Sequence, residues 1–431
     1  MRKVLLVIAN SFFYLSFGVH GFIYLLLITI VSYLAAKNKR INLLCTTILI
    51  CLFGLVVTKY FSQTFNIIVP VGISFFTFKI VGYLFDVKNE KYEPVCNFFD
   101  YYNYVFFFAQ ITSGPIERCN RFIAQLNALN RQLSYEQLKS GFVIFGMGLF
   151  EKMIISARLS EVANNIFARA DELYGVYMLV GILAYGMQLY TDFDSYSNIA
   201  IGLAKMLGID TCRNFNVPYL AHNLSDFWRR WHISLSSWLK DYLYIPLGGN
   251  RKGSYRKYLN IMIVSLVSGI WHGNTANFIM WGFLHGIGQI GANIYHTRIT
   301  NKLNIDNKFI KLLYKLLAIV VTFGFVNVAW LFFRLDFNIA VDYLQHLFVF
   351  EGWELVLSNI GISYFDWIML WLLLAFVFVS DLFRYFTNGI DDFNRMPFIV
   401  RWAVYLGIVF VFVMLFPYDG GYVSDFIYSN F

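Results

Sequence analysis

His272 is the residue of this chain whose position offers the clearest chemistry. It lies in the stretch 268–274, "SGIWHGN", between a tryptophan and a helix-breaking glycine at the end of an apolar segment. A buried, neutral imidazole is a good general base for a hydroxyl, because its pKa lies near working pH. An ionisable side chain is costly in such sequence, so its presence there favours a functional role.

The motifs that the sequence lacks narrow the class of reaction. It contains no G-x-S-x-G elbow, no P-loop, and no carboxylate, histidine and serine at a recognisable spacing. A base without a serine nucleophile of its own needs an acceptor that supplies the hydroxyl. We therefore expect transfer of an acyl group from a thioester to a hydroxyl, rather than hydrolysis or phosphoryl transfer.

A second histidine, His232, lies in the mixed polar and aromatic stretch "DFWRRWHISLSSWLKDYLYIPLGG". Asp226 and Arg230 are four residues apart, so they could pair on one helical face. An aromatic belt with snorkelling arginines explains the tryptophans of this stretch, including Trp231, equally well. His285, in "WGFLHG", is interpreted as a packing histidine, with a place on the same cavity as His272 as the alternative.

The helical face below His272 is small and polar. Ser265, Ser268, Gly269 and His272 follow the spacing i, i+3, i+4, i+7 and share that face. It would border either a narrow passage or a close contact with another helix, and the spacing leaves both interpretations open. The residues expected to support this site are Trp271, Asn274 and Asn277.

Other polar residues are weaker candidates for a role at membrane depth. Gln110 begins "QITSGPIER", and Asp192 and Asp194 lie between two predicted spans, where a solvated interfacial loop is the alternative. A basic loop after two glycines could meet the phosphates of coenzyme A, although ordinary positive-inside charge explains it more simply. Its residues are Arg251, Lys252, Arg256 and Lys257. The five cysteines form no CxxC pair, and we predict neither a disulfide scaffold nor a metal site.

The elements that must position these residues are membrane helices. The 431 residues are 58% hydrophobic, 20% aromatic and 14% charged, which is far from the composition of a soluble domain. Roughly 11 to 13 segments are long and apolar enough to span a bilayer. We predict one all-α, multi-pass domain over residues 1–431, surrounded by membrane lipid and not bound to nucleic acid. The predicted spans are 4–17, 20–36, 42–60, 66–85, 98–114, 140–158, 173–191, 193–208, 258–272, 276–295, 311–334, 363–384 and 399–417.

The interval 209–257 is too charged to face lipid and too apolar for an aqueous loop. We expect interfacial or re-entrant segments there. The span 258–272 is about 22 Å long at 1.5 Å per residue, shorter than a hydrocarbon core of about 30 Å. If the basic clusters at 251–257 and 298–311 are cytoplasmic, His272 lies within the thickness of the membrane.

The ordered motifs of this chain resemble the membrane-bound O-acyltransferase superfamily, in particular its bacterial branch for alginate and peptidoglycan O-acetylation. The resemblance is carried by "DFWRRWHISLSSWLKDYLYIPLGGNR" followed by "GIWHG", and by further motifs along the chain. These are "VPVGISFFTFKIVGYLFDV", "FFAQITSGPIER", "LYTDFDSYSNIAIGLAKMLGI", "NFNVPYLAHNLSDFWRRWH" and "DFIYSNF".

The resemblance implies a ring of tilted helices around a tunnel that joins the two faces of the bacterial cytoplasmic membrane. His272 would be the catalytic histidine and His232 the second signature histidine, nearer the donor. No bound cofactor is expected, and acetyl-CoA or an acyl-carrier thioester would be the co-substrate. The acceptor would be a cell-envelope glycan or an extracytoplasmic partner protein with an SGNH-type esterase fold.

Two alternatives and one departure accompany this resemblance. The branch that transfers D-alanine from an acyl-carrier protein to teichoic acid has a similar histidine pair. A polysaccharide-related transporter would also use broken helices and buried polar residues. Compared with the family, the amino terminus is expected to lack one hydrophobic segment before Arg2, and the first apolar run is interpreted as a retained helix.

Overall fold

The computed structural model of the chain describes residues 2–129, 133–298, 307–349, 354–387 and 389–416. All regular elements within these ranges are helices. In chain order they are α1 (Arg2–Leu15), α2 (Val19–Asn38), α3 (Ile41–Tyr60), α4 (Ser62–Phe65), α5 (Ile73–Lys88), α6 (Phe98–Phe106), α7 (Cys119–Ala128), α8 (Tyr135–Phe150), η1 (Glu151–Ser156), α9 (Ala157–Phe167), α10 (Val176–Met206), η2 (Pro218–Leu220), α11 (Leu224–Arg230), α12 (Ile233–Leu239), η3 (Lys240–Tyr244), α13 (Gly253–His272), α14 (Ala276–Arg298), α15 (Lys308–Arg334), α16 (Phe337–Leu347), η5 (Leu357–Ile360), α17 (Tyr364–Phe386), α18 (Ile390–Arg395) and α19 (Phe398–Leu415).

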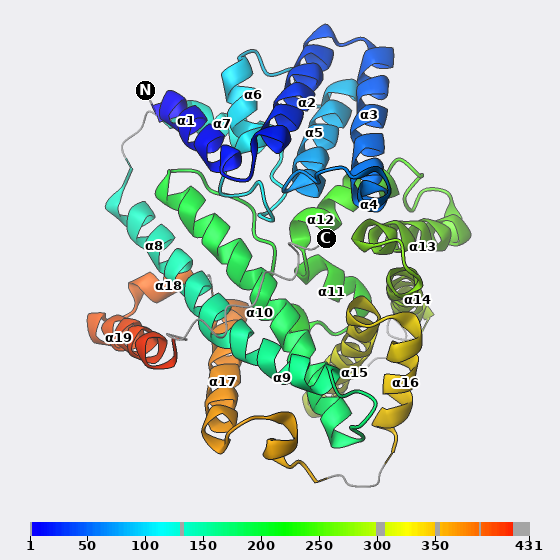
Figure 1. Cartoon of the computed structure of the whole chain (residues 1–431), viewed down its shortest axis with the longest axis vertical. Helices are drawn as coiled ribbons and strands as arrows, with labels where there is room; N and C mark the ends of the chain where they lie inside the picture. Colours follow the sequence, from blue (N-terminus) through cyan, green and yellow to red (C-terminus); the bar gives the residue numbers. More distant parts are fainter. Residues whose placement is uncertain (1, 130–132, 299–306, 350–353, 388, 417–431) are drawn as a thin grey trace.

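The helices form two groups with a middle zone between them (Figure 1). Helices α1 to α7 gather at one end, while α8 to α10 and α14 to α19 form the other end. Helices α8 and α10 pack along much of their length, as do α13 and α14. The short helices α11 and α12 lie in the middle zone, so the region that carries His232 lies between the two groups.

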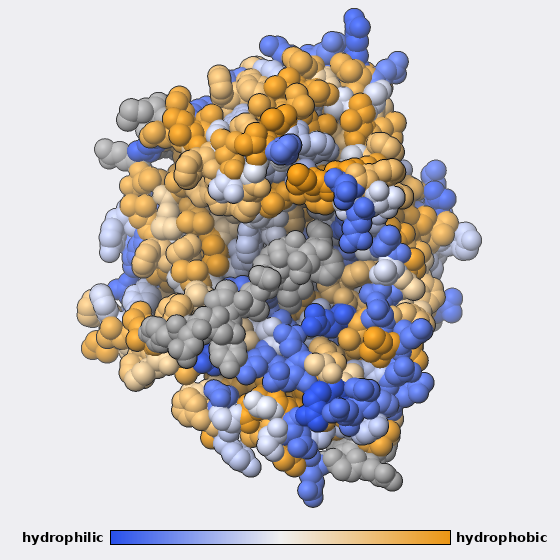
Figure 2. All heavy atoms as spheres, in the orientation of Figure 1, coloured by the Kyte–Doolittle hydropathy of each residue, from blue (hydrophilic) through white to orange (hydrophobic). Residues whose placement is uncertain are grey.

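Five of the described helices are long and apolar enough to cross a bilayer: α2, α3, α15, α17 and α19. Large apolar side chains cover the outside of the molecule, most visibly over α1 to α3 (Figure 2). Phe53, Val320 and Met414 are each more than 60% exposed, which only a lipid environment makes favourable. The chain is therefore a multi-pass helical membrane protein. The remaining predicted spans correspond to helices with more polar side chains, and their number across the bilayer stays a prediction.

The prediction of two spans at 173–191 and 193–208 is wrong, because α10 is one continuous helix from Val176 to Met206. Asp192 and Asp194 lie in its middle and are buried. Asp192 pairs with Lys152 from η1, and Asp194 with Arg384 from α17 at 2.8 Å. Partners from other helices compensate both carboxylates, so the helix can continue through them.

Two other predicted spans also differ from the structure. The predicted span 98–114 is helical only to Phe106, and turns follow to Gly114. The predicted span 66–85 begins as a helix only at Ile73, after Gly72 in the left-handed region with φ 72°. A Cβ at Gly72 would lie 1.9 Å from the carbonyl oxygen of Ile111, so these two turns touch through their backbones. The last residue of the span 399–417, the motif 425–431 and Lys302 of the second basic cluster lie outside the described residues.

Candidate functional site

Helix α13 ends at His272, as the glycine after it predicts. Gly273 has an extended backbone, and its N–H donates to the carbonyl of Gly269. A Cβ on Gly273 would lie 2.3 Å from the ring of Phe278, the third residue of α14. Any larger residue would therefore displace this ring, and the sharp turn places His272 beside the start of α14.

His272 lies in a box of aromatic rings and is 4% exposed. Its ring centroid is 4.4 Å from that of Trp271, 4.8 Å from Phe333 of α15, and 5.2 Å from Trp281 of α14. The sequence singled out Trp271 but not the other two rings. Trp281 could have been found from its position four residues before His285 in "WGFLHG", which puts both residues on one helical face. Three helices thus enclose the imidazole and keep bulk water away from it.

Helix α3 holds the last turn of α13 from outside. Lys59 donates a hydrogen bond to the carbonyl of Trp271, and Tyr60 donates one to the carbonyl of Ile270. The Lys59 ammonium also lies 4.9 Å from the centre of the Trp271 ring. These donors satisfy carbonyl groups that the end of a helix leaves without intrahelical partners. We did not identify Lys59 from the sequence, although a lysine at the end of an apolar span was visible there.

The polar face below His272 meets α14 at very short range. A Cβ on Gly269 would lie 2.3 Å from the carbonyl oxygen of Phe278, and one on Gly282 would lie 2.6 Å from the carbonyl oxygen of Ser265. At Gly269 the face is therefore a close helix contact, as one of the two interpretations expected. Ser265 and Ser268 also line a small cavity. A passage along this face stays a prediction.

His232 lies just before α12 with a left-handed backbone, φ 43°, and is 1% exposed. Its ring meets that of Phe193 from α10 edge to face, at 4.7 Å. His272 and His285 both contact the ring of Trp281, at 5.2 and 4.8 Å between ring centroids. Trp231, the residue before His232, packs on Trp330, which stacks on Trp281. The structure therefore brings the two predicted histidines together, from segments 40 residues apart in sequence.

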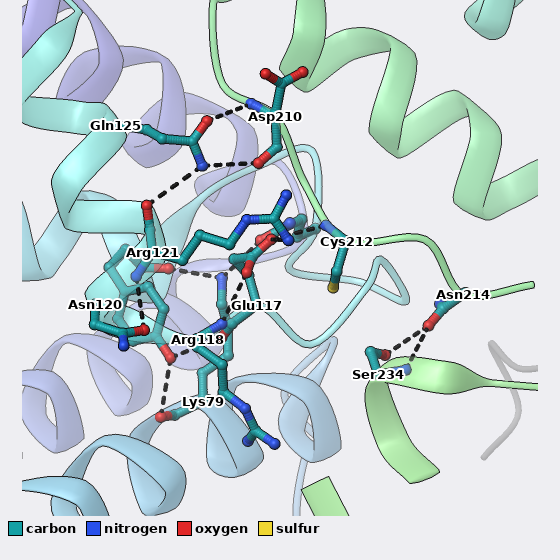
Figure 3. Close-up of polar contacts among 12 residues, drawn as sticks. Lys79, Glu117, Arg118, Asn120, Arg121, Gln125, Asp210, Cys212, Asn214 and Ser234 are labelled. Carbon is teal, nitrogen blue, oxygen red and sulfur yellow. Dashed lines mark hydrogen bonds and ion pairs between the residues drawn. The ribbon is translucent and has the colours of Figure 1, made fainter. Parts of the chain in front are cut away.

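Asn214 anchors the segment that carries His232 (Figure 3). Its carbonyl accepts from the N–H of Ile233 at 2.8 Å. Its side-chain oxygen accepts from the hydroxyl of Ser234 at 2.6 Å, and its amide donates to Ser197 of α10 at 3.1 Å. These bonds hold the two residues that follow His232, whose own backbone has a conformation that non-glycine residues rarely adopt.

Asn214 in turn belongs to a loop that is held by the segment 117–125 (Figure 3). Glu117 is 2% exposed and accepts from the N–H of Cys212 at 2.9 Å. Gln125 exchanges two hydrogen bonds with the backbone of Asp210, at 2.7 and 2.8 Å. Burial beside Glu117 raises the pKa of the Cys212 thiol to about 12, so this cysteine is not a nucleophile.

Gln110 belongs to the support of this loop rather than to the histidine box. Its side-chain oxygen accepts from the buried ammonium of Lys79 at 3.2 Å. Lys79 also donates to the carbonyl of Tyr104 at 2.7 Å. These contacts tie α5 to the turns before Glu117, and no described contact joins Gln110 to His272.

The other residues predicted to support the site are an ion pair, one tryptophan and two asparagines. Asp226 and Arg230 form the expected pair, at 3.0 Å. Trp231 is 1% exposed and packs 5.0 Å from Trp330 of α15, so it is a core residue rather than part of an exposed belt. Asn277 is buried near the start of α14, whereas Asn274 is exposed in the turn.

The basic loop divides into two halves. Arg251 and Lys252 are exposed. Arg256 donates to the carbonyl of Leu247 at 3.3 Å, and Lys257 donates to the side chain of Asn293 at 2.7 Å. Within the described residues, the first pair is thus available to a phosphate while the second pair holds the loop and α14. No cluster of three or more metal-binding side chains occurs in the described part of the chain.

Comparison with known proteins decides the family. The profile of the membrane-bound O-acyltransferase family matches residues 88–338, which include both histidines and the whole of the box around His272. The chain belongs to this family. The match thus contains the whole segment that encloses His272 at the end of α13.

Several curated relatives cover much of the chain. A peptidoglycan O-acetyltransferase of Helicobacter pylori is 37% identical over 307 residues, 65% of this chain and 57% of the relative. A protein of Pseudomonas putida named as a probable alginate O-acetylase is 35% identical over 324 residues, 74% of this chain and 64% of the relative. A teichoic acid D-alanyltransferase of Bacillus subtilis is 28% identical over 342 residues, 72% of this chain and 84% of the relative. The chain thus spans about three fifths of the length of the first two.

Proposed function

We propose that this chain is a membrane O-acyltransferase that moves an acyl group, most simply acetyl, from a cytoplasmic thioester to a hydroxyl at the outer face. The acceptor is a cell-envelope polysaccharide, or a serine of a partner protein that serves it. The observation that carries the proposal is the buried imidazole of His272 at the broken end of α13, with His232 beside it, inside the family match.

The reaction needs one base. A neutral His272 takes the proton of the acceptor hydroxyl while the hydroxyl oxygen attacks the thioester carbonyl carbon. The carbon–sulfur bond then breaks, the thiolate leaves, and the proton returns from His272 to the sulfur. The aromatic box supports this role because it excludes water, which would otherwise compete as the acceptor.

The proposal includes a route across the bacterial cytoplasmic membrane. The donor reaches the histidines from the cytoplasm and the acceptor from outside, through a tunnel within a ring of helices. The short helices α11 and α12 between the two helix groups support such a passage. Interrupted helices are tolerated at membrane depth only where they are buried in protein or line a cavity. An extracytoplasmic partner with an SGNH-type fold would carry the acyl group onward. Arg251 and Lys252 are the proposed contacts to coenzyme A phosphates.

D-alanyl transfer from an acyl-carrier protein to teichoic acid is the second candidate. The observation that favours it is the match to the D-alanyltransferase of Bacillus subtilis, which covers 84% of that relative. The higher identity to the acetyltransferases favours the acetyl donor.

The decisive experiment follows label from radioactive acetyl-CoA in membranes that contain the protein and its native envelope glycans. We expect label in an extracted glycan or a partner ester with the wild type, and none with His272→Ala. His296→Ala is the matched control, since His296 is exposed near the end of α14 and should transfer normally. The variants His272→Asn and His272→Gln can still form hydrogen bonds but cannot take up a proton, so they separate these two roles of the histidine.

The other outcomes are equally informative. Label that reaches glycan with a folded His272→Ala variant would remove His272 as the base. If acetyl-CoA gives no product but D-alanyl carrier protein does, the D-alanyl candidate replaces the acetyl one. If neither donor is consumed by the complete membranes, the enzyme proposal fails and a transporter remains.

A further inference from the structure

A small cavity adjoins the histidine box between the middle zone and the α13–α14 pair. Its volume is about 80 Å³. Side chains from four helices line it: Trp228, Ser236, Ser265, Ser268, Trp281 and His285. Ser268 lies one helical turn before His272, and the ring of Trp281 contacts both His272 at 5.2 Å and His285 at 4.8 Å.

His285, one of the residues that line this cavity, carries a buried hydrogen-bond donor. The indole N–H of Trp228 donates to Nδ1 of His285 at 3.2 Å. An indole nitrogen can only donate, so Nδ1 is the acceptor and the neutral imidazole carries its proton on Nε2. His285 is 1% exposed, and Nε2 is buried without a hydrogen-bond partner among the described residues.

Two more polar groups around the cavity share this property. The hydroxyl of Ser268 and the indole N–H of Trp281 are both buried without a described partner. Buried polar atoms are nearly always hydrogen-bonded, so three such groups on residues that line one cavity point to a ligand or water that accepts from them. The three groups can all donate hydrogen bonds, which points to an oxygen acceptor.

We propose that this cavity receives the acyl group of the donor and that Nε2–H of His285 donates to its carbonyl oxygen, an inference that rests on the proposed acyl transfer. When the acceptor oxygen attacks, the carbonyl oxygen takes up the electron pair of the C=O bond, and a fixed donor stabilises that charge. The charge returns to form the C=O bond as the carbon–sulfur bond breaks. His285 is then a second catalytic residue, beside the base His272.

The volume of the cavity indicates the size of the acyl group that it receives. One water occupies about 30 Å³ in the liquid, so the cavity has room for about three small heavy atoms. An acetyl group has three and matches this volume. Val264 and Leu239 are the aliphatic residues of the lining.

The test compares His285→Gln with His285→Asn in the acetyl transfer assay. The amide nitrogen of Gln can reach the place of Nε2–H, whereas that of Asn ends near the place of Nδ1. We expect Gln to retain kcat within about tenfold and Asn to lose about 100-fold or more in kcat with little change in KM. Equal rates for wild type and Asn would overturn the inference while leaving the acyltransferase intact. No transfer by the wild type would overturn both.

A second variant keeps the test decisive if position 285 tolerates no change. Val264→Ala enlarges the cavity, and its control is Val267→Ala on the same helix, since Val267 does not line the cavity and is 40% exposed. We expect Val264→Ala to raise the rate with propionyl-CoA or butyryl-CoA relative to acetyl-CoA at least fivefold, because a missing methylene is worth about 10-fold or more in such pockets. An unchanged preference in both variants would show that the cavity holds water only.

Discussion

Replacement of Gly269 by alanine tests whether the close contact of α13 and α14 positions His272. The added Cβ would lie 2.3 Å from the carbonyl oxygen of Phe278 and 3.2 Å from the Cα of Gly282. Both obstacles are backbone atoms, which cannot rotate away. Because ordinary contact begins near 3.4 Å, the two helices must separate by about 1 Å at this point.

Two free energies oppose each other in this variant. Overpacking of a tight contact costs about 1–3 kcal/mol. Alanine is favoured over glycine inside a helix by about 0.5–1 kcal/mol. We therefore expect a net loss of about 1–2 kcal/mol in stability. The larger effect falls on activity, because His272 lies three residues further on and a misplacement of about 1 Å can cost about 100-fold in rate.

Thermal unfolding in detergent and acetyl transfer in membranes measure the two effects separately. Gly291→Ala on α14 is the matched control, because a Cβ there meets no atom within 4 Å. It should be neutral or slightly stabilising and fully active. A Gly269→Ala protein that unfolds at the wild-type temperature and transfers acetyl at the wild-type rate would refute the reasoning.

Three further variants test the supports of the site. Asn214→Ala removes the anchors around His232, and we expect at least a tenfold loss in kcat in the same assay, with normal expression in membranes. Lys59→Met removes the donor to the end of α13 and should lower both kcat and the unfolding temperature, whereas Lys37→Met, at an exposed position, should change neither; equal behaviour of the two would contradict a capping role. Charge reversal at Arg251 and Lys252 should raise the apparent KM for acetyl-CoA at least fivefold without changing kcat, and an unchanged KM would remove them from the donor site.

The sequence was sufficient to predict the features that depend only on residues close together in the chain. The end of α13 at His272 follows from an apolar run and the glycine after it, and the structure confirms it. The pair of Asp226 and Arg230 follows from helical spacing and forms as predicted. The family followed from ordered motifs, which the profile match over residues 88–338 confirms.

The local sequence pattern was misleading where a buried charged residue has a partner that is distant in the sequence. Asp192 and Asp194 suggested a break between two spans, because isolated carboxylates do not belong in apolar sequence. Lys152 and Arg384 compensate them from other helices, so α10 continues. The sequence contains all four residues but shows nothing of their pairing.

By itself, the sequence determined the class of protein and the helix that ends in His272, and the catalytic roles of His272 and His232 stay predictions from its motifs. These features depend on composition, period and short motifs, which act over a few residues. Only the tertiary structure decided what surrounds them: Lys59, 212 residues away from Trp271, holds the end of α13, and Trp281 joins His272 to His285. Such contacts depend on how the helices pack in three dimensions, and a one-dimensional pattern does not record the distances between helices.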